Sequence, residues 1–124
     1  MIKTQLLVTV VDDDESVRES LPDLLKEFGF AVQVFSSAEE FLASDGVAKT
    51  GCLLLDIAMP GMSGPELHRE LERRGLTIPV IFITARQDEA VRSRLLEDGA
   101  MECLFKPFSD TALLEALNKA VSDQ

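Results

Sequence analysis

LLLDIAMPGMSG, residues 53–64, is an unbroken apolar run that ends in one carboxylate, Asp56, and continues into a turn rich in proline and glycine. A short apolar run between turn residues is typical of a strand that is buried on both faces, as in a parallel sheet. Asp56 is then the residue at which this strand leaves the core. Because ligands of open α/β sheets bind outside the carboxyl ends of the strands, Asp56 is a candidate functional residue.

The size and composition of the chain are those of one globular domain, and we expect residues 1–124 to form it. The formal net charge of −10 argues against direct contact with nucleic acid or with an anionic membrane, because both need clustered lysine and arginine. The sequence shows neither a membrane-spanning segment nor a signal-peptide pattern, which favours a cytoplasmic location. Cys52 and Cys103 are isolated in apolar segments, so we expect buried reduced thiols.

Strand and helix patterns alternate five times along the chain. The strand patterns lie at residues 6–11, 31–35, 53–56, 79–83 and 101–105. The helix patterns lie at residues 15–28, 37–43, 64–75 and 88–98 and from Ser109 onward. This alternation predicts an α/β protein with a parallel sheet covered by helices on both faces. Right-handed crossovers favour a flavodoxin-like (βα)5 doubly wound sheet with the strand order 2-1-3-4-5.

Chemically active side chains follow four of the five predicted strands: Asp12 and Asp13, Asp56, Thr84, and Lys106. Each of them alone could be an ordinary surface, cap or turn residue, but together they would meet at one edge of the sheet. Three converging carboxylates repel one another unless a cation holds them, and Mg²⁺ prefers oxygen ligands of this kind. A carboxylate can also attack phosphorus to give an aspartyl phosphate, with an ammonium group and a hydroxyl group as donors to the phosphoryl oxygens.

The sequence closely resembles the receiver domain of two-component response regulators, over essentially the whole chain. The residues that carry the resemblance are Val11-Asp12-Asp13, Asp56 with Met59-Pro60 and Met62-Ser63-Gly64, Thr84-Ala85, and Lys106-Pro107-Phe108. The resemblance implies that Asp56 accepts phosphate from a phosphohistidine on a sensor histidine kinase or phosphotransfer protein, and from small phosphodonors. It implies a signalling domain rather than an enzyme, with only self-phosphorylation and autodephosphorylation. It also implies a cis peptide bond between Lys106 and Pro107.

The same resemblance implies a ligand set for Mg²⁺. Asp13, Asp56 and the backbone carbonyl of Ala58 would bind the ion directly, and Asp12 would act through a metal-bound water.

The resemblance also implies that Thr84, Ala85 and Lys106 surround the phosphoryl group and that Thr84 moves toward it after transfer. Many receivers carry an aromatic switch residue three positions before the lysine, whereas this chain has Cys103. A thiol is too small to fill the space of a ring. Phe105 should point to the same face of the strand as Cys103, and the sequence does not decide whether it takes over that role.

Two other function classes fit the predicted fold less well. A haloacid-dehalogenase-like Mg²⁺ phosphatase needs a second acid two residues after its nucleophile, but that position is Ala58. A flavin-binding domain needs a phosphate-binding loop rich in Ser, Thr or Gly after the first strand, where this chain has acids. His68 lies among charged residues of a predicted helix, and we expect an exposed histidine rather than a phosphate carrier or ligand.

The output of the domain stays open at the level of sequence. The chain is similar to receivers that precede a helix-turn-helix DNA-binding domain, which favours a role in transcription regulation through a domain outside this chain. A single-domain phosphorelay shuttle is the alternative. A homodimer through the last helical face on phosphorylation is a further hypothesis.

Overall fold

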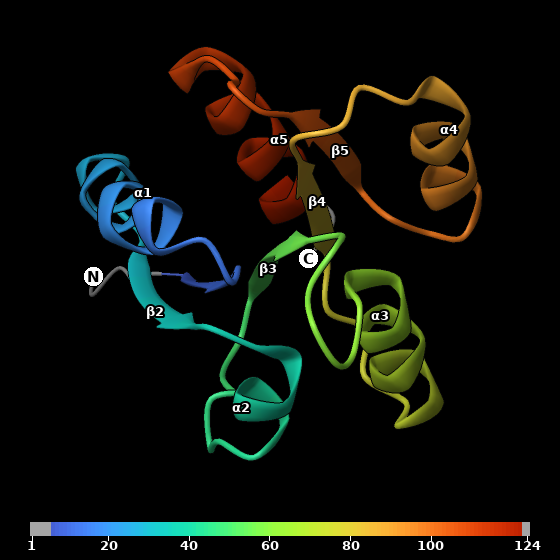
Figure 1. Cartoon of the computed structure of the whole chain (residues 1–124). Helices are drawn as coiled ribbons and strands as arrows, with labels where there is room; N and C mark the ends of the chain where they lie inside the picture. The colour runs from blue at the N-terminus through green and yellow to red at the C-terminus, as the bar shows by residue number, and fades with distance from the viewer. Residues whose placement is uncertain (1–5, 123–124) are drawn as a thin grey trace.

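The computed structural model describes residues 6–122, which contain a five-stranded parallel sheet in the order β2-β1-β3-β4-β5. The strands are β1 (Leu7–Val11), β2 (Ala31–Phe35), β3 (Cys52–Asp56), β4 (Val80–Thr84) and β5 (Glu102–Phe105). The helices are α1 (Glu15–Glu27), α2 (Ala38–Leu42), α3 (Gly64–Arg73), α4 (Glu89–Glu97) and α5 (Asp110–Ser122). Helices α1 and α5 lie on one side of the sheet, and α2, α3 and α4 lie on the other (Figure 1). The predicted fold class and strand order are confirmed.

Each face of the sheet has its own hydrophobic core, because neighbouring residues of a strand point to opposite faces. In β3, Leu53 and Leu55 pack with α2, α3 and α4, whereas Cys52 and Leu54 pack with α1 and α5. Strand β3 lies between β1 and β4, and all five of its residues are buried. Burial on both faces explains why the run has no alternating polar residue before Asp56.

The helix ends follow the local sequence signals. Asp14, Ser37 and Asp88 accept hydrogen bonds from backbone N–H groups at the start of α1, α2 and α4, and Ser109 does so for α5. Glycines with positive φ follow α1, α3 and α4: Gly29, Gly75 and Gly99. Observed element boundaries therefore differ from the predicted ones by only one or two residues.

His68 is buried, so the expectation that it is exposed was wrong. Only 8% of this residue is accessible, and its ring meets the ring of Phe82 edge-on with centroids 5.8 Å apart. Helix α3 packs against β4 through the same face that carries Leu67 and Leu71. Burial lowers the pKa of His68 below its ordinary value, although Glu72 and Asp98 oppose the shift. The neutral ring therefore acts as a packing residue.

Cys52 and Cys103 are buried free thiols, as predicted. Burial raises the pKa of Cys52 to about 12 and that of Cys103 to about 11, so both remain protonated at neutral pH. Among residues 6–122, no helix combines the length and the apolar character needed to cross a bilayer.

Candidate functional site

The carboxyl ends of β1 and β3 bring three carboxylates together. Val11 pairs with Leu55 across these neighbouring strands, so the residues that follow, Asp12 and Asp56, lie side by side. One carboxylate oxygen from each of Asp12, Asp13 and Asp56 lies within 4.8 Å of the other two. Asp12 has no exposed surface and Asp56 is 7% exposed, whereas Asp13 is exposed. The cluster is therefore open to solvent on the side of Asp13.

The electrostatics of the cluster act most strongly on Asp56. Burial, followed by the charge of Asp12, raises the pKa of Asp56 to about 7, and Lys106 opposes this shift. A carboxyl group with this pKa is substantially protonated at neutral pH in the absence of a cation. Asp56 thus needs additional positive charge nearby to be fully ionised.

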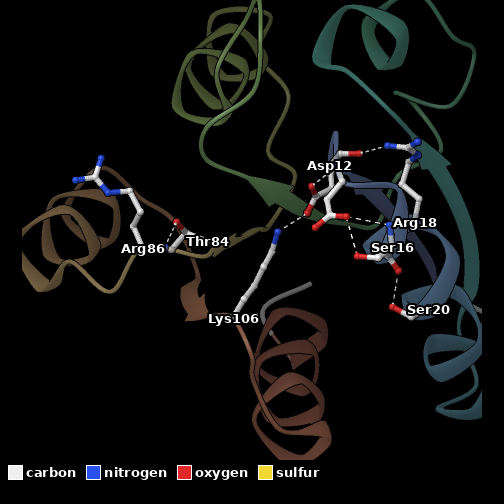
Figure 2. Close-up of polar contacts among 8 residues, drawn as sticks. Asp12, Ser16, Arg18, Ser20, Thr84, Arg86 and Lys106 are labelled. Atoms are coloured by element: carbon white, nitrogen blue, oxygen red, sulfur yellow. Dashed lines mark hydrogen bonds and ion pairs between the residues drawn. The ribbon is translucent and has the colours of Figure 1, made fainter.

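Lys106 reaches the cluster from the end of β5. Its Nζ donates to Oδ2 of Asp12 over 2.9 Å, and Figure 2 shows its side chain extended toward Asp12. Lys106 forms its ion pair with Asp12, but the ammonium charge also lowers the pKa of Asp56. The peptide bond that follows, between Lys106 and Pro107, is cis.

A cavity of about 320 Å³ opens beside the acids. Asp13, Asp56 and Ala58 line one part of it, and Thr84, Ala85 and Lys106 line another. Its inner wall includes Cys103 and Phe105, which both pack in the core on the α4 side of the sheet. Thr84 is 7% exposed, and its hydroxyl oxygen accepts a hydrogen bond from the backbone N–H of Arg86 over 3.2 Å. The structure therefore brings the predicted acids, hydroxyl and lysine to one cavity, with Asp12 just behind its lining.

The loop between β3 and α3, which carries Ala58, is fixed at several points. The backbone N–H of Gly64 donates to the carbonyl of Ile57 over 2.9 Å, and a Cβ atom at Gly64 would overlap the carbonyl oxygen of Asp56. Glu39 of α2 accepts a hydrogen bond from the backbone N–H of Met62 over 2.8 Å. A residue with a side chain at Gly64 could not approach the phosphoacceptor candidate this closely.

Three sets of contacts that hold the site were not predicted from the sequence. Ser63 and Glu66 form a reciprocal capping box at the start of α3, and the spacing Ser-x-x-Glu could have revealed it. Glu39 holds the β3–α3 loop from another helix, and Arg18 of α1 donates to the backbone carbonyl of Asp12 over 3.0 Å. These last two contacts join different structural elements, and neither residue belongs to a local motif.

The donor set fits a hard divalent cation. Three carboxylates lie close together, burial and then the charge of Asp12 raise the pKa of Asp56, and the cluster opens into a cavity on the side of Asp13. Mg²⁺ is usually held by one or two carboxylates together with water and phosphate oxygens. The acids supply the carboxylate ligands, and the open side leaves room for water and phosphate oxygens.

An acidic cluster opposite a lysine and a hydroxyl, at the carboxyl edge of a doubly wound sheet, is an arrangement that could hold an anion together with a metal ion. Comparison with known proteins agrees with this class. Residues 8–118 match the family described as response regulator receiver domain. The chain belongs to this family, and it is a receiver domain of the two-component response regulators. Such domains act in signalling rather than as enzymes, and they bind Mg²⁺ at an acidic pocket.

The relatives include transcriptional regulators. Nodulation protein W of Bradyrhizobium diazoefficiens is 43% identical over 92% of this chain and 50% of its own length. The transcriptional regulatory protein FixJ of Rhizobium meliloti is 42% identical over 94% of this chain and 57% of its own length. The crystal structure of FixJ-N has a TM-score of 0.87 and 39% identity and covers 98% of both chains. The chain thus spans about half the length of the curated relatives that it matches.

Proposed function

We propose that Asp56 accepts a phosphoryl group and that its phosphorylation switches the interaction of this domain with a partner or an output domain. The observation that carries this proposal is the convergence of Asp12, Asp13 and Asp56 within 4.8 Å, with Lys106 bonded to the cluster. A single receiver domain over residues 1–124 is part of the same proposal.

In the proposed reaction an oxygen of the Asp56 carboxylate attacks phosphorus while the bond from phosphorus to the leaving group of the donor breaks. The ammonium of Lys106 and the hydroxyl of Thr84 would donate to the phosphoryl oxygens, and Ala85 lines the cavity beside Thr84. Movement of Thr84 toward the new group would then alter the wall that contains Cys103 and Phe105. In this way the domain would report phosphorylation to its surface.

We assign the Mg²⁺ ligands to Asp13, Asp56 and the backbone carbonyl of Ala58, with Asp12 acting through a water. The ion, when bound, neutralises negative charge on the carboxylates and the transferring phosphoryl group. Asp13 is the exposed member of the acid cluster, and Ala58 lines the same cavity, which supports this assignment. Full ionisation of Asp56 would follow from the added positive charge.

The phosphodonor is proposed to be a phosphohistidine of a sensor histidine kinase or phosphotransfer protein, in the cytoplasm. Regulators related to this chain act with sensor histidine kinases. Transcription regulation is the favoured output because relatives such as FixJ are named as transcriptional regulatory proteins and are longer than this chain. A single-domain phosphorelay shuttle is the alternative. Formation of a homodimer on phosphorylation is proposed together with the role in transcription regulation.

The test is labelling with acetyl phosphate and Mg²⁺, followed by intact-protein mass spectrometry. We expect wild-type protein to gain one acid-labile phosphoryl group and Asp56→Asn to gain none. Asp23→Asn, an exposed position on α1, should label like wild type. Label that persists in Asp56→Asn would refute the assignment. Light scattering with and without beryllofluoride tests the dimer in the same preparations, since an unchanged mass would reject it.

A further inference from the structure

Arg18 holds the loop between β1 and α1 from the side of the helix. Its guanidinium Nη1 donates to the backbone carbonyl oxygen of Asp12 over 3.0 Å, a contact drawn in Figure 2. The backbone N–H of Arg18 also donates to the carbonyl of Asp14 over 3.2 Å. Arg18 is half-buried, so the contact is partly shielded from water. One residue of α1 therefore binds the loop on both sides of Asp13.

Every polar group of Asp12 has a hydrogen-bonding partner. Its N–H donates to the carbonyl of Phe35 over 3.2 Å, and its side-chain oxygens accept from the N–H of Asp14 and from Lys106, each over 2.9 Å. Its carbonyl accepts from Arg18. The fixed residue is thus Asp12, whereas the neighbouring Asp13 is exposed.

The position of Asp13 depends on the peptide unit that joins it to Asp12. A peptide unit is planar, so fixing the carbonyl of Asp12 also fixes the N and Cα atoms of Asp13. Without that restraint, repulsion among the three carboxylates favours rotation of this peptide and displacement of Asp13 toward solvent. The Arg18 bond opposes this rotation directly.

We infer that Arg18 is a positioning residue, which holds the Asp12–Asp13 peptide so that the Asp13 carboxylate is ready to bind a divalent cation. The inference rests on the proposed Mg²⁺ site and adds a residue to it. Arg18 does not itself line the cavity, and its guanidinium bonds the backbone carbonyl of Asp12 rather than a carboxylate oxygen. Removing the bond leaves the three acidic side chains in place but less well ordered.

The positive charge of Arg18 can itself change the affinity of the acids for Mg²⁺. The effect of this charge and the effect of the hydrogen bond therefore need separate controls. Arg18→Met removes the bond and the charge. Arg18→Lys keeps the charge and offers a donor without the planar guanidinium. Lys26→Met removes one positive charge from an exposed position in the last turn of the same helix. Long-range charge effects are largely screened at about 1 M salt, whereas a local hydrogen bond is not.

The experiment measures Mg²⁺ binding by calorimetry without any phosphodonor, at about 0.1 M and about 1 M salt. We expect Arg18→Met to weaken Mg²⁺ binding about fivefold to tenfold at both salt concentrations, in line with loss of an outer contact of a metal site. Arg18→Lys should lose less, and Lys26→Met should match wild type. Circular dichroism and thermal unfolding establish that each variant is folded. If Arg18→Met does not fold, Arg18→Lys must still bind Mg²⁺ more weakly than Lys26→Met.

Two further measurements separate positioning from a general structural role. The order parameters of the backbone amides of residues 12–14 should fall in metal-free Arg18→Met. The Mg²⁺ concentration for half-maximal labelling should rise about fivefold, with less than about a twofold change in the labelling rate at saturating Mg²⁺. Unchanged Mg²⁺ affinity in Arg18→Met, or a loss that Lys26→Met reproduces or that disappears at high salt, would overturn the inference. Wild-type protein that binds Mg²⁺ but gains no label would instead contradict the proposed function and leave the role of Arg18 standing.

Discussion

Nζ of Lys106 lies 2.9 Å from Oδ2 of Asp12, and this ion pair joins the end of β5 to the end of β1. Strands β3 and β4 lie between them in the sheet, so the pair crosses above the strand ends that carry Asp56 and Thr84. The Asp12 side chain has no exposed surface, and that of Lys106 is 20% exposed. Removal of one partner from an ion pair that is this strongly shielded from water destabilises the fold, because the other charge stays buried without compensation.

Replacing Lys106 with Met should therefore destabilise the metal-free protein. The methionine keeps most of the aliphatic stem but leaves the buried Asp12 carboxylate without its ammonium partner, and we expect a loss of about 2–3 kcal/mol. Urea unfolding in EDTA at neutral pH measures the change. Lys119→Met, on an exposed position of α5, is the matched control and should shift stability by less than about 0.5 kcal/mol. Equal stability of the two variants would show that the ion pair contributes nothing.

Asp56→Asn should change how the stability of the metal-free protein depends on pH. The pKa of Asp56 is about 7 in the folded protein, against 3.8 for an unperturbed aspartate, so the folded state holds this proton more tightly than the unfolded state. Protonation of Asp56 therefore contributes fully to the free energy of unfolding below pH 3.8, and this contribution is lost as the pH rises to about 7. The free energy of unfolding of Asp56→Asn, relative to that of wild type, should therefore increase by about 2 kcal/mol between about pH 5 and about pH 8. Urea unfolding at both pH values tests this, and Asp23→Asn should show no such gain.

The sequence predicted those parts of the site that depend on one strand at a time. Asp56 and Thr84 each stand where an apolar run stops, and the run itself reveals the buried strand that positions the residue. Five alternating strand and helix units imply a strand order that places these ends on one edge of the sheet. The sequence therefore predicts that the acids and Lys106 converge.

Contacts between separate elements could not be predicted in this way. His68 is surrounded by charged residues in the sequence, yet packing of α3 against β4 buries it against Phe82. Glu39 and Arg18 reach backbone atoms of loops outside their own helices, and no residue pattern specifies that reach. The partner of Lys106 likewise depends on side-chain positions at two strand ends rather than on spacing.

Mg²⁺ should stabilise the protein more at about pH 8 than at about pH 5, because a proton on Asp56 competes with the cation. At a free Mg²⁺ concentration about tenfold above the dissociation constant, the expected gain is about 1.4 kcal/mol. Differential scanning calorimetry with Mg²⁺ or EDTA measures it as a rise in the unfolding temperature. Asp13→Asn should lose most of this rise, whereas Asp23→Asn should retain it. An equal rise in Asp13→Asn would place the ion elsewhere.

Gly64→Ala should damage both the stability and the phosphorylation of the domain. An added Cβ atom would overlap the carbonyl oxygen of Asp56 and would lie 3.1 Å from both the carbonyl carbon of Asp56 and Cα of Ile57, all of them backbone atoms that cannot rotate away. We expect a loss of about 2–4 kcal/mol in urea unfolding, together with slower labelling by acetyl phosphate, because the start of α3 or Asp56 itself must shift.

Gly75→Ala separates this effect from the general consequence of replacing a glycine. Gly75 has a φ of +78° after the end of α3, and nothing lies within 4 Å of its added Cβ atom. The alanine should therefore lose about 1 kcal/mol through backbone strain alone and should label at the wild-type rate. If Gly64→Ala labels as fast as Gly75→Ala, close approach of α3 to the backbone of Asp56 has no role in phosphoryl transfer.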